Sequence, residues 1–213
     1  MPRKSRLKQS TSPKHDDMPR IEGHEASAHA SAGQTDKATR AKEQTRQPPT
    51  EPRYLGVQRI VSGGQTGVDR GALDAAIALQ LEHGGWCPRG RQAEDGRIPE
   101  MYQLRETDAL EYSVRTERNV IDSCGTLLLF RDRLQRGTLL TYRMAQKHKR
   151  PALRVRLDLP LDVGLIQSWI IEHAIRVLNV AGPRASSVPA IATDTVAVLM
   201  RVFTQPPPRR LFP

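Results

Sequence analysis

The sequence lacks the features of several protein classes. It has two cysteines, Cys87 and Cys124, which form no C-x-x-C pair and accompany no zinc-binding pattern. A zinc ribbon and a disulfide-stabilised scaffold are therefore both excluded. No apolar run approaches the roughly 18 residues of a membrane-spanning helix, so we expect no membrane association. Aromatic residues make up only 4% of the 213 residues. A location in the reducing cytoplasm fits this composition best.

Large apolar side chains are almost missing from residues 1–53, which are rich in Ser, Thr, Lys, Arg, Gln, Pro and Gly. Such a segment cannot bury enough apolar surface to offset the entropy lost on ordering. It also lacks the apolar region of a secretory signal, and its acidic residues argue against a transit peptide. We therefore expect a disordered basic tail over residues 1–53, one folded domain over 54–205 and a flexible Pro/Arg tail over 206–213.

Lysine is scarce in the folded part. Residues 54–213 contain 22 basic and 16 acidic residues, and only Lys147 and Lys149 among them are lysines. Arginine suits bidentate contacts to phosphate or carboxylate. A genomic base composition that favours arginine codons explains the bias equally well.

Strand-like and helix-like segments alternate from residue 58. Apolar runs predict strands at 58–62, 83–88, 125–130, 152–157 and 175–182, and helical spacing predicts helices at 68–82, 109–123, 137–149, 162–174 and 190–203. Strands joined by helical crossovers predict a Rossmann-like, doubly wound α/β fold, with a mainly parallel sheet and helices on both faces. The polar segment 89–108 interrupts the pattern, and a loop of this length is usually functional or disordered.

The stretch "VSGGQTGVDRGALDAAIAL" (61–79) places glycines between a predicted strand and a predicted helix. Glycine permits close backbone approach, and a helix start exposes N–H groups and partial positive charge, so Gly63 to Gly67 can cradle an anion. Thr66 adds a hydroxyl and Arg70 a guanidinium. Asp69 in the first helical turn is either a favourable charge at the helix start or a ligand contact. A tight turn without a ligand is the alternative interpretation.

Other strand ends carry similar residues. Arg136-Gly137-Thr138 repeats the strand–glycine–helix arrangement, and Asn179 to Arg184 end the last predicted strand. Trp86 is either a core residue or a stacking surface, and Arg89 beside Gly90 is a candidate anion contact. In a doubly wound sheet these strand ends converge on one edge, where ligands bind.

Familiar catalytic motifs are missing. The sequence has no GK[ST] loop for phosphoryl transfer, no G-x-G-x-x-G with an acid about 20 residues later, and no G-x-S-x-G nucleophile turn. P-loop, NAD-binding and α/β-hydrolase chemistries are therefore disfavoured.

Several segments together resemble one family. They are "VSGGQTGVDRGALDAA", "HGGWCPRGRQAEDGRIP", "YQLRET", "RTERNVIDSCGTLLL", "RGTLLT" and "RVLNVAGPRAS". The resemblance is to the molybdenum cofactor carrier proteins, which are similar to the circularly permuted YpsA-like branch of the SLOG superfamily, and it spans about residues 57–204. It implies a Rossmann-like domain that binds nucleotide-like or pterin-nucleotide ligands. An algal member binds and protects molybdenum cofactor, and for most members the ligand is inferred from their relatives.

The resemblance also implies a ligand site. Its residues would be Gly63, Gly64, Gln65, Thr66, Gly67, Asp69, Trp86, Pro88, Arg89, Gly90, Glu94, Asp95, Thr116, Glu117, Asn119, Gly137, Thr138, Asn179, Gly182, Pro183 and Arg184. Arg136 stands where the family commonly has a glycine. Related phosphoribohydrolases carry PGGxGTxxE, but here Leu139, Leu140 and Thr141 follow the Gly-Thr pair, so that glutamate is absent from its expected place.

Three functional hypotheses follow. The first is non-catalytic binding, as carrier or sensor, of molybdenum cofactor (molybdopterin) or a nucleotide derivative, held by backbone amides with Arg70, Arg89, Arg136 and Arg184. The second is hydrolysis of a nucleoside phosphate at its glycosidic bond, with Glu94, Asp95 or Glu117 as the acid. The third is single-stranded nucleic-acid binding, suggested by the net charge of +10. The partner expected first is a small anionic ligand; no metal site is expected, and a homo-oligomer is compatible with the sequence.

Overall fold

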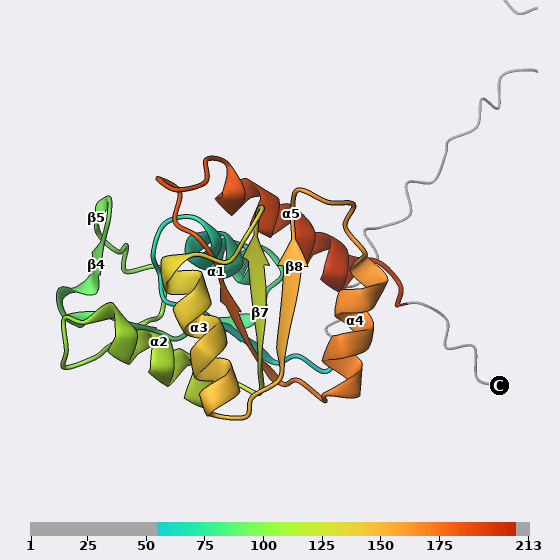
Figure 1. Ribbon diagram of the computed structural model, residues 1–213, viewed down its shortest axis with the longest axis horizontal. Coiled ribbons are helices and arrows are strands. Elements are labelled where there is room, and N and C mark those ends of the chain that lie inside the picture. Colours follow the sequence, from blue (N-terminus) through green and yellow to red (C-terminus); the bar gives the residue numbers. More distant parts are fainter. Residues whose placement is uncertain (1–54, 208–213) are drawn as a thin grey trace, which may run out of the picture. The chain divides into compact units, whose positions relative to one another are not determined.

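A computed structural model of the protein describes the structure of residues 55–207 (Figure 1). The tail predicted for residues 1–53, and all but the first two residues of the tail predicted for 206–213, lie outside the described residues. Within residues 55–207, no helix is long and apolar enough to cross a membrane.

Five strands form one parallel sheet. They are β1 (Arg59–Val61), β2 (Glu82–Gly84), β7 (Gly125–Phe130), β8 (Ala152–Arg156) and β9 (Val177–Ala181). Their order is β2-β1-β9-β7-β8, and every pair of neighbours is parallel. The predicted Rossmann-like α/β fold with a parallel sheet is confirmed.

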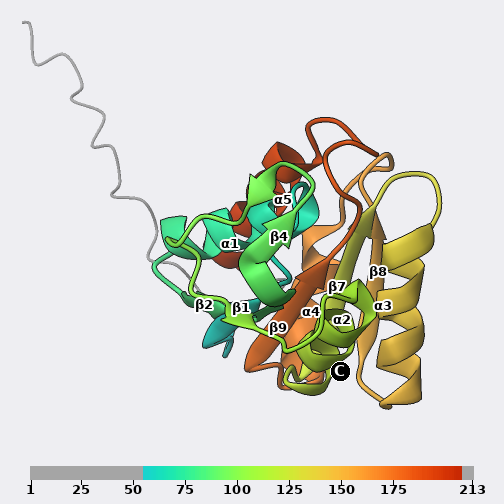
Figure 2. The same ribbon diagram turned by 90° about the vertical axis from the view of Figure 1, so that its left-hand side faces the viewer.

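Five helices cover the two faces of this sheet. They are α1 (Val68–Ala78), α2 (Tyr112–Ile121), α3 (Arg136–Lys147), α4 (Val163–Glu172) and α5 (Ile191–Thr204). Helix α5 packs against both α1 and α4, whereas α2 packs against α3. Figure 2 shows α3 on one side of the sheet and α1 and α5 on the other. Each predicted helix is present, with ends shifted by a few residues.

The core explains why β7 is a continuous apolar run. All six of its residues are buried, because β7 lies between β9 and β8 and has helices on both faces. Leu127 and Leu129 belong to the main core with residues of α1, α4 and α5. Thr126 alternates with them and therefore faces the side of α2 and α3, where its hydroxyl accepts a hydrogen bond from Asn179 Nδ2 at 3.2 Å.

The segment that interrupts the sequence pattern contains short ordered elements. These are the 3₁₀ turn Arg89–Arg91 and the strands β4 (Gln92–Ala93), β5 (Gly96–Arg97) and β6 (Arg105–Glu106). Strands β4 and β5 form an antiparallel hairpin, and β6 pairs with β3 (Trp86–Cys87). The sequence predicts a single strand over residues 83–88, but the structure has two strands there in different sheets. Strand β2 ends at Gly84, and β3 begins at Trp86.

A buried arginine organises this segment. Arg91 is 4% exposed, and its guanidinium donates hydrogen bonds of 2.8–3.2 Å to backbone carbonyls. The four acceptors are the oxygens of Ile98, Pro99, Tyr102 and Leu104. One side chain therefore satisfies carbonyl groups that have no strand partner, which the sequence pattern does not reveal.

Replacing Arg91 tests this role. We expect Arg91→Ala to lower the free energy of unfolding by about 3 kcal/mol, because buried carbonyls would lose charge-assisted hydrogen bonds. Urea denaturation measures the change. Arg97→Ala is the control: Arg97 has a side chain that is 60% exposed, so its loss should cost about 0.5 kcal/mol or less. Equal effects of the two substitutions would contradict the assignment.

Candidate anion-binding site

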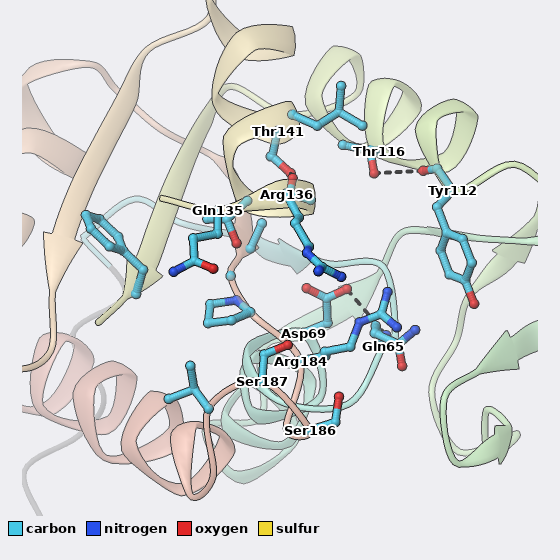
Figure 3. A pocket seen from close by; sticks show the side chains of 18 of the residues that line it. Gln65, Asp69, Tyr112, Thr116, Gln135, Arg136, Thr141, Arg184, Ser186 and Ser187 are labelled. Carbon is cyan, nitrogen blue, oxygen red and sulfur yellow. Dashed lines mark hydrogen bonds between the residues drawn. The ribbon is translucent and has the colours of Figure 1, made fainter. Parts of the chain in front are cut away.

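A cavity of about 490 Å³ lies at the carboxyl ends of β1, β9 and β7 (Figure 3). This volume is typical of small-molecule sites, which span roughly 300–1,000 Å³. Nine of the residues predicted from the sequence line it: Gln65, Asp69, Thr116, Arg136, Gly137, Thr138, Gly182, Pro183 and Arg184. Segments far apart in the sequence thus meet in one place, as the topology of a parallel sheet requires.

The start of α3 lines this cavity, and the N–H groups of Thr138 and Leu139 already donate to the carbonyl oxygen of Gln135. The preceding residue, Gln135, makes no side-chain hydrogen bond to cap the helix. The N–H groups of Arg136 and Gly137 have no carbonyl partner within α3, as is usual for a first helical turn. Arg136 has φ +41°, a conformation that favours glycine. The helix start therefore presents N–H donors and partial positive charge to a ligand.

The start of α1 is less open, because protein groups already occupy it. Gly67 has φ +79°, and an added Cβ there would lie 2.4 Å from the carbonyl oxygen of Pro183. The N–H of Val68 donates to the same oxygen at 3.2 Å. Gly67 thus allows the segment after β9 to pack on the glycine-rich loop, which places Arg184 in the cavity wall.

A buried ion pair joins α1 to α2 at one end of the cavity. Asp69 is 4% exposed, and its Oδ2 accepts hydrogen bonds from Arg115 Nη1 at 2.9 Å and from the backbone N–H of Gln65 at 3.3 Å. Gly63 makes room for this pair, since a Cβ there would lie only 1.3 Å from Arg115 Nη1. Arg115 is not among the residues predicted from the sequence, although its neighbour Thr116 on the same helix is.

The wall of the cavity is strongly basic. Five arginines line it, Arg115, Arg131, Arg133, Arg136 and Arg184, against one acid among the described residues, Asp69. Outside the wall, Asp194 pairs with Arg131 at 2.5 Å and Glu94 lies 3.7 Å from Arg184. Within residues 55–207 Arg136 has no ion pair. Positive charge in a concave site attracts anions.

Three acids predicted for the site, Glu94, Asp95 and Glu117, make contacts within the protein and do not line the cavity. Asp95 pairs with Arg70, and Glu117 accepts hydrogen bonds from Lys147 and His148 at 2.7 and 2.8 Å. These hydrogen bonds hold the pKa of both carboxyl groups below their ordinary values. Both groups are therefore ionised near neutral pH.

Glu94 joins the β4–β5 hairpin to two loops at the cavity. It accepts hydrogen bonds from the Thr66 hydroxyl and from the hydroxyl and backbone N–H of Ser186. Burial acts to raise the pKa of Glu94, but these hydrogen bonds and the charge of Arg184 outweigh it, so the pKa lies below its ordinary value of 4.5. Glu94 thereby connects the β1–α1 loop to the β9–α5 loop.

The remaining predicted residues lie near the cavity or away from it, and their role stays a prediction. The guanidinium groups of Arg105 and Arg118 both lie over the Trp86 ring, and the Asn119 amide hydrogen-bonds to both backbone groups of Trp86. The β1–α1 loop contains Gly63, Gly64, Thr66 and Gly67, and α1 contains Arg70; none of them is among the residues that line the cavity. Pro88, Arg89 and Gly90 follow β3, where the Gly90 N–H donates to Glu106, and Asn179 lies within β9.

Two comparisons place this geometry among known proteins. The profile of the circularly permutated YpsA SLOG family matches residues 60–203. The chain belongs to this family. A crystal structure named "Putative molybdenum carrier protein" from Syntrophus aciditrophicus SB is similar to it, with 45% sequence identity and a TM-score of 0.67 over 73% of this chain and 98% of the other. A comparison with curated proteins found no match.

In this SLOG-family protein, Gly63 can be tested as the residue that admits Arg115. We expect Gly63→Ala to lower the free energy of unfolding by about 2 kcal/mol, because the new methyl group overlaps the guanidinium of Arg115. In an Arg115→Ala background the same change should cost less than about 1 kcal/mol. Urea denaturation of the unsubstituted protein, the two single variants and the double variant gives the coupling free energy between positions 63 and 115. Gly137→Ala is the control, since no atom lies within 4 Å of the added Cβ; additive costs would contradict the proposed overlap.

Glu94 gives a pH-dependent prediction. Its folded-state pKa is lowered below 4.5, so its stabilising contribution is present above 4.5 and is lost as the pH falls through the folded-state value. We expect the free energy of unfolding of Glu94→Gln to decrease less than that of the unsubstituted protein as the pH falls below 4.5. Urea denaturation at successive pH values measures this. Parallel pH curves would show that Glu94 does not contribute as described.

Proposed function

We propose that the protein binds a phosphate-bearing heterocycle without turning it over, as a carrier of molybdenum cofactor or a related nucleotide. The observation that supports this best is the convergence of the uncapped start of α3 with Arg136 and Arg184 in one cavity. Backbone N–H groups would hold phosphate oxygens, and the guanidinium groups would neutralise the charge. The name of the similar crystal structure agrees with this class of ligand.

The part of the cavity around Gln65 suits a polar heterocycle. Gln65 is 5% exposed, and its side-chain nitrogen Nε2 has no hydrogen-bond partner among the described residues. Tyr112 and Thr116 also line the cavity, and the Thr116 hydroxyl, which donates to the Tyr112 carbonyl, can still accept a hydrogen bond. A pterin or purine carries ring nitrogens and an oxo group that can accept the Gln65 hydrogen bond.

The molybdenum would be held by the cofactor and not by side chains of the protein. Neither Cys87 nor Cys124 lines the cavity, and burial raises the pKa of the Cys87 thiol, which keeps it protonated. Within residues 55–207, no group of three or more His, Cys, Asp or Glu side chains is placed to hold a metal ion. The residues present therefore fit the phosphate and the heterocycle of the cofactor.

Glycosidic hydrolysis finds less support in this geometry. A general acid must carry a proton near neutral pH, and the pKa values of Glu94, Asp95 and Glu117 are all lowered. Asp69, the one acid among the described residues that line the cavity, is already paired with Arg115. Binding alone is the function that these contacts favour.

Calorimetry and native mass spectrometry test the proposal. We expect guanosine 5′-monophosphate, 6-hydroxymethylpterin phosphate or anaerobically prepared molybdenum cofactor to bind with micromolar affinity, and freshly purified protein to retain a ligand of one of these classes. Guanosine without its phosphate is the control and should bind at least about 10-fold more weakly, because the charge-assisted contacts are lost. No heat with any phosphate-bearing ligand would contradict the proposal, and release of ribose phosphate would show turnover.

A further inference from the structure

Arg136 has an unfavourable backbone conformation, and no side-chain hydrogen bond or ion pair among the described residues compensates for it. Its φ of +41° lies in the left-handed region that non-glycine residues rarely adopt. Arg91 shares this conformation, but its guanidinium makes four hydrogen bonds to backbone carbonyls. Arg136 is exposed and, in the part of the chain that the structure describes, makes no side-chain hydrogen bond or ion pair. The fold alone gives no reason for an arginine at this position.

The surroundings of Arg136 give such a reason. Figure 3 shows Arg136 and Arg184 entering the cavity from opposite walls, α3 and the β9–α5 loop. Asp69 is already paired with Arg115, and Glu94 lies 3.7 Å from Arg184, so no acid among the described residues balances the charge of Arg136. Two like charges in a concave site repel each other unless an anion lies between them.

A second observation at the same cavity also points to a bound molecule. The side-chain amide of Gln65 is more than nine-tenths buried, and its Nε2 has no partner among residues 55–207. Buried donors are nearly always paired in folded proteins. The unpaired Gln65 donor and the unpaired Arg136 guanidinium therefore both point to a ligand in this cavity.

We propose that Arg136 makes the site selective for a terminal phosphate monoester, which carries nearly two negative charges at neutral pH, over a phosphodiester, which carries one. The start of α3 offers roughly half a positive charge, sufficient to favour either anion. Arg136 adds a full charge and a planar fork of donors, which suits the additional unsubstituted oxygen of a monoester. This inference rests on the proposed function and names the chemical form of phosphate that the site takes.

The test compares two ligands that differ only at the phosphate: guanosine 5′-monophosphate and its phosphate methyl ester. Calorimetry should show that the unsubstituted protein binds the monoester at least about 10-fold more tightly than the methyl ester. In Arg136→Gly, affinity for the monoester should fall about 10- to 100-fold and affinity for the methyl ester by less than about 3-fold. Glycine fits φ +41°, so the variant should unfold at an equal or higher temperature.

Lys149→Gly is the matched control. Lys149 also has a positive φ of +53°, is exposed and follows the opposite end of α3. Its replacement removes the same charge and relieves similar strain, but should leave both affinities unchanged.

The outcomes separate this inference from the proposed function. If Arg136→Gly keeps the preference of the unsubstituted protein, or weakens both ligands equally, Arg136 does not select the phosphate and the inference is overturned while the binding function stands. If Lys149→Gly reproduces the effect, the cause is the net charge of the protein and the inference is likewise overturned. If the unsubstituted protein binds neither ligand, the inference is overturned, and the proposed function fails as well if no other phosphate-bearing ligand binds.

Discussion

The buried ion pair between Asp69 and Arg115 holds together the elements that form one end of the cavity. It joins α1 to α2, and it requires a residue without a side chain at position 63, because the guanidinium lies where a Cβ would be. Separating two buried charges is costly, since each would lose its partner in a poorly solvated place. The pair therefore fixes the glycine-rich loop against α2 and keeps Asp69 from neutralising the other arginines of the wall.

This division of charge gives the cavity its chemical character. In the hairpin region, Asp95 pairs with Arg70 of α1, whereas Glu94 binds Thr66 of the β1–α1 loop and Ser186 of the β9–α5 loop. The carboxylates of Glu94 and Asp95 therefore hold the hairpin, the loops and α1 in place. Arg136 and the backbone donors at the start of α3 remain available for an anionic ligand.

The sequence predicted the fold well, because hydrophobic periodicity directly reports which elements are buried. The alternation of apolar runs with helical spacing was sufficient to predict the parallel sheet. The glycines at the strand ends predict a ligand-binding edge, which stays a prediction. The path of segment 89–108 was not predictable in this way, since it depends on Arg91 bonding to carbonyls up to 13 residues away. Arg115 was not predicted for a similar reason, since its partner Asp69 lies 46 residues earlier in the chain. Polar contacts between distant segments leave no periodic pattern in a sequence.

The central claim is that an anion lies at the start of α3 between two arginines. Backbone amide chemical shifts during titration with guanosine 5′-monophosphate test it most directly, because they report where the ligand is. The account predicts that the largest shifts fall on residues 136–138 and 182–184, with smaller shifts at Gln65. Shifts confined to the amino ends of the strands, around residues 80–83, would contradict it.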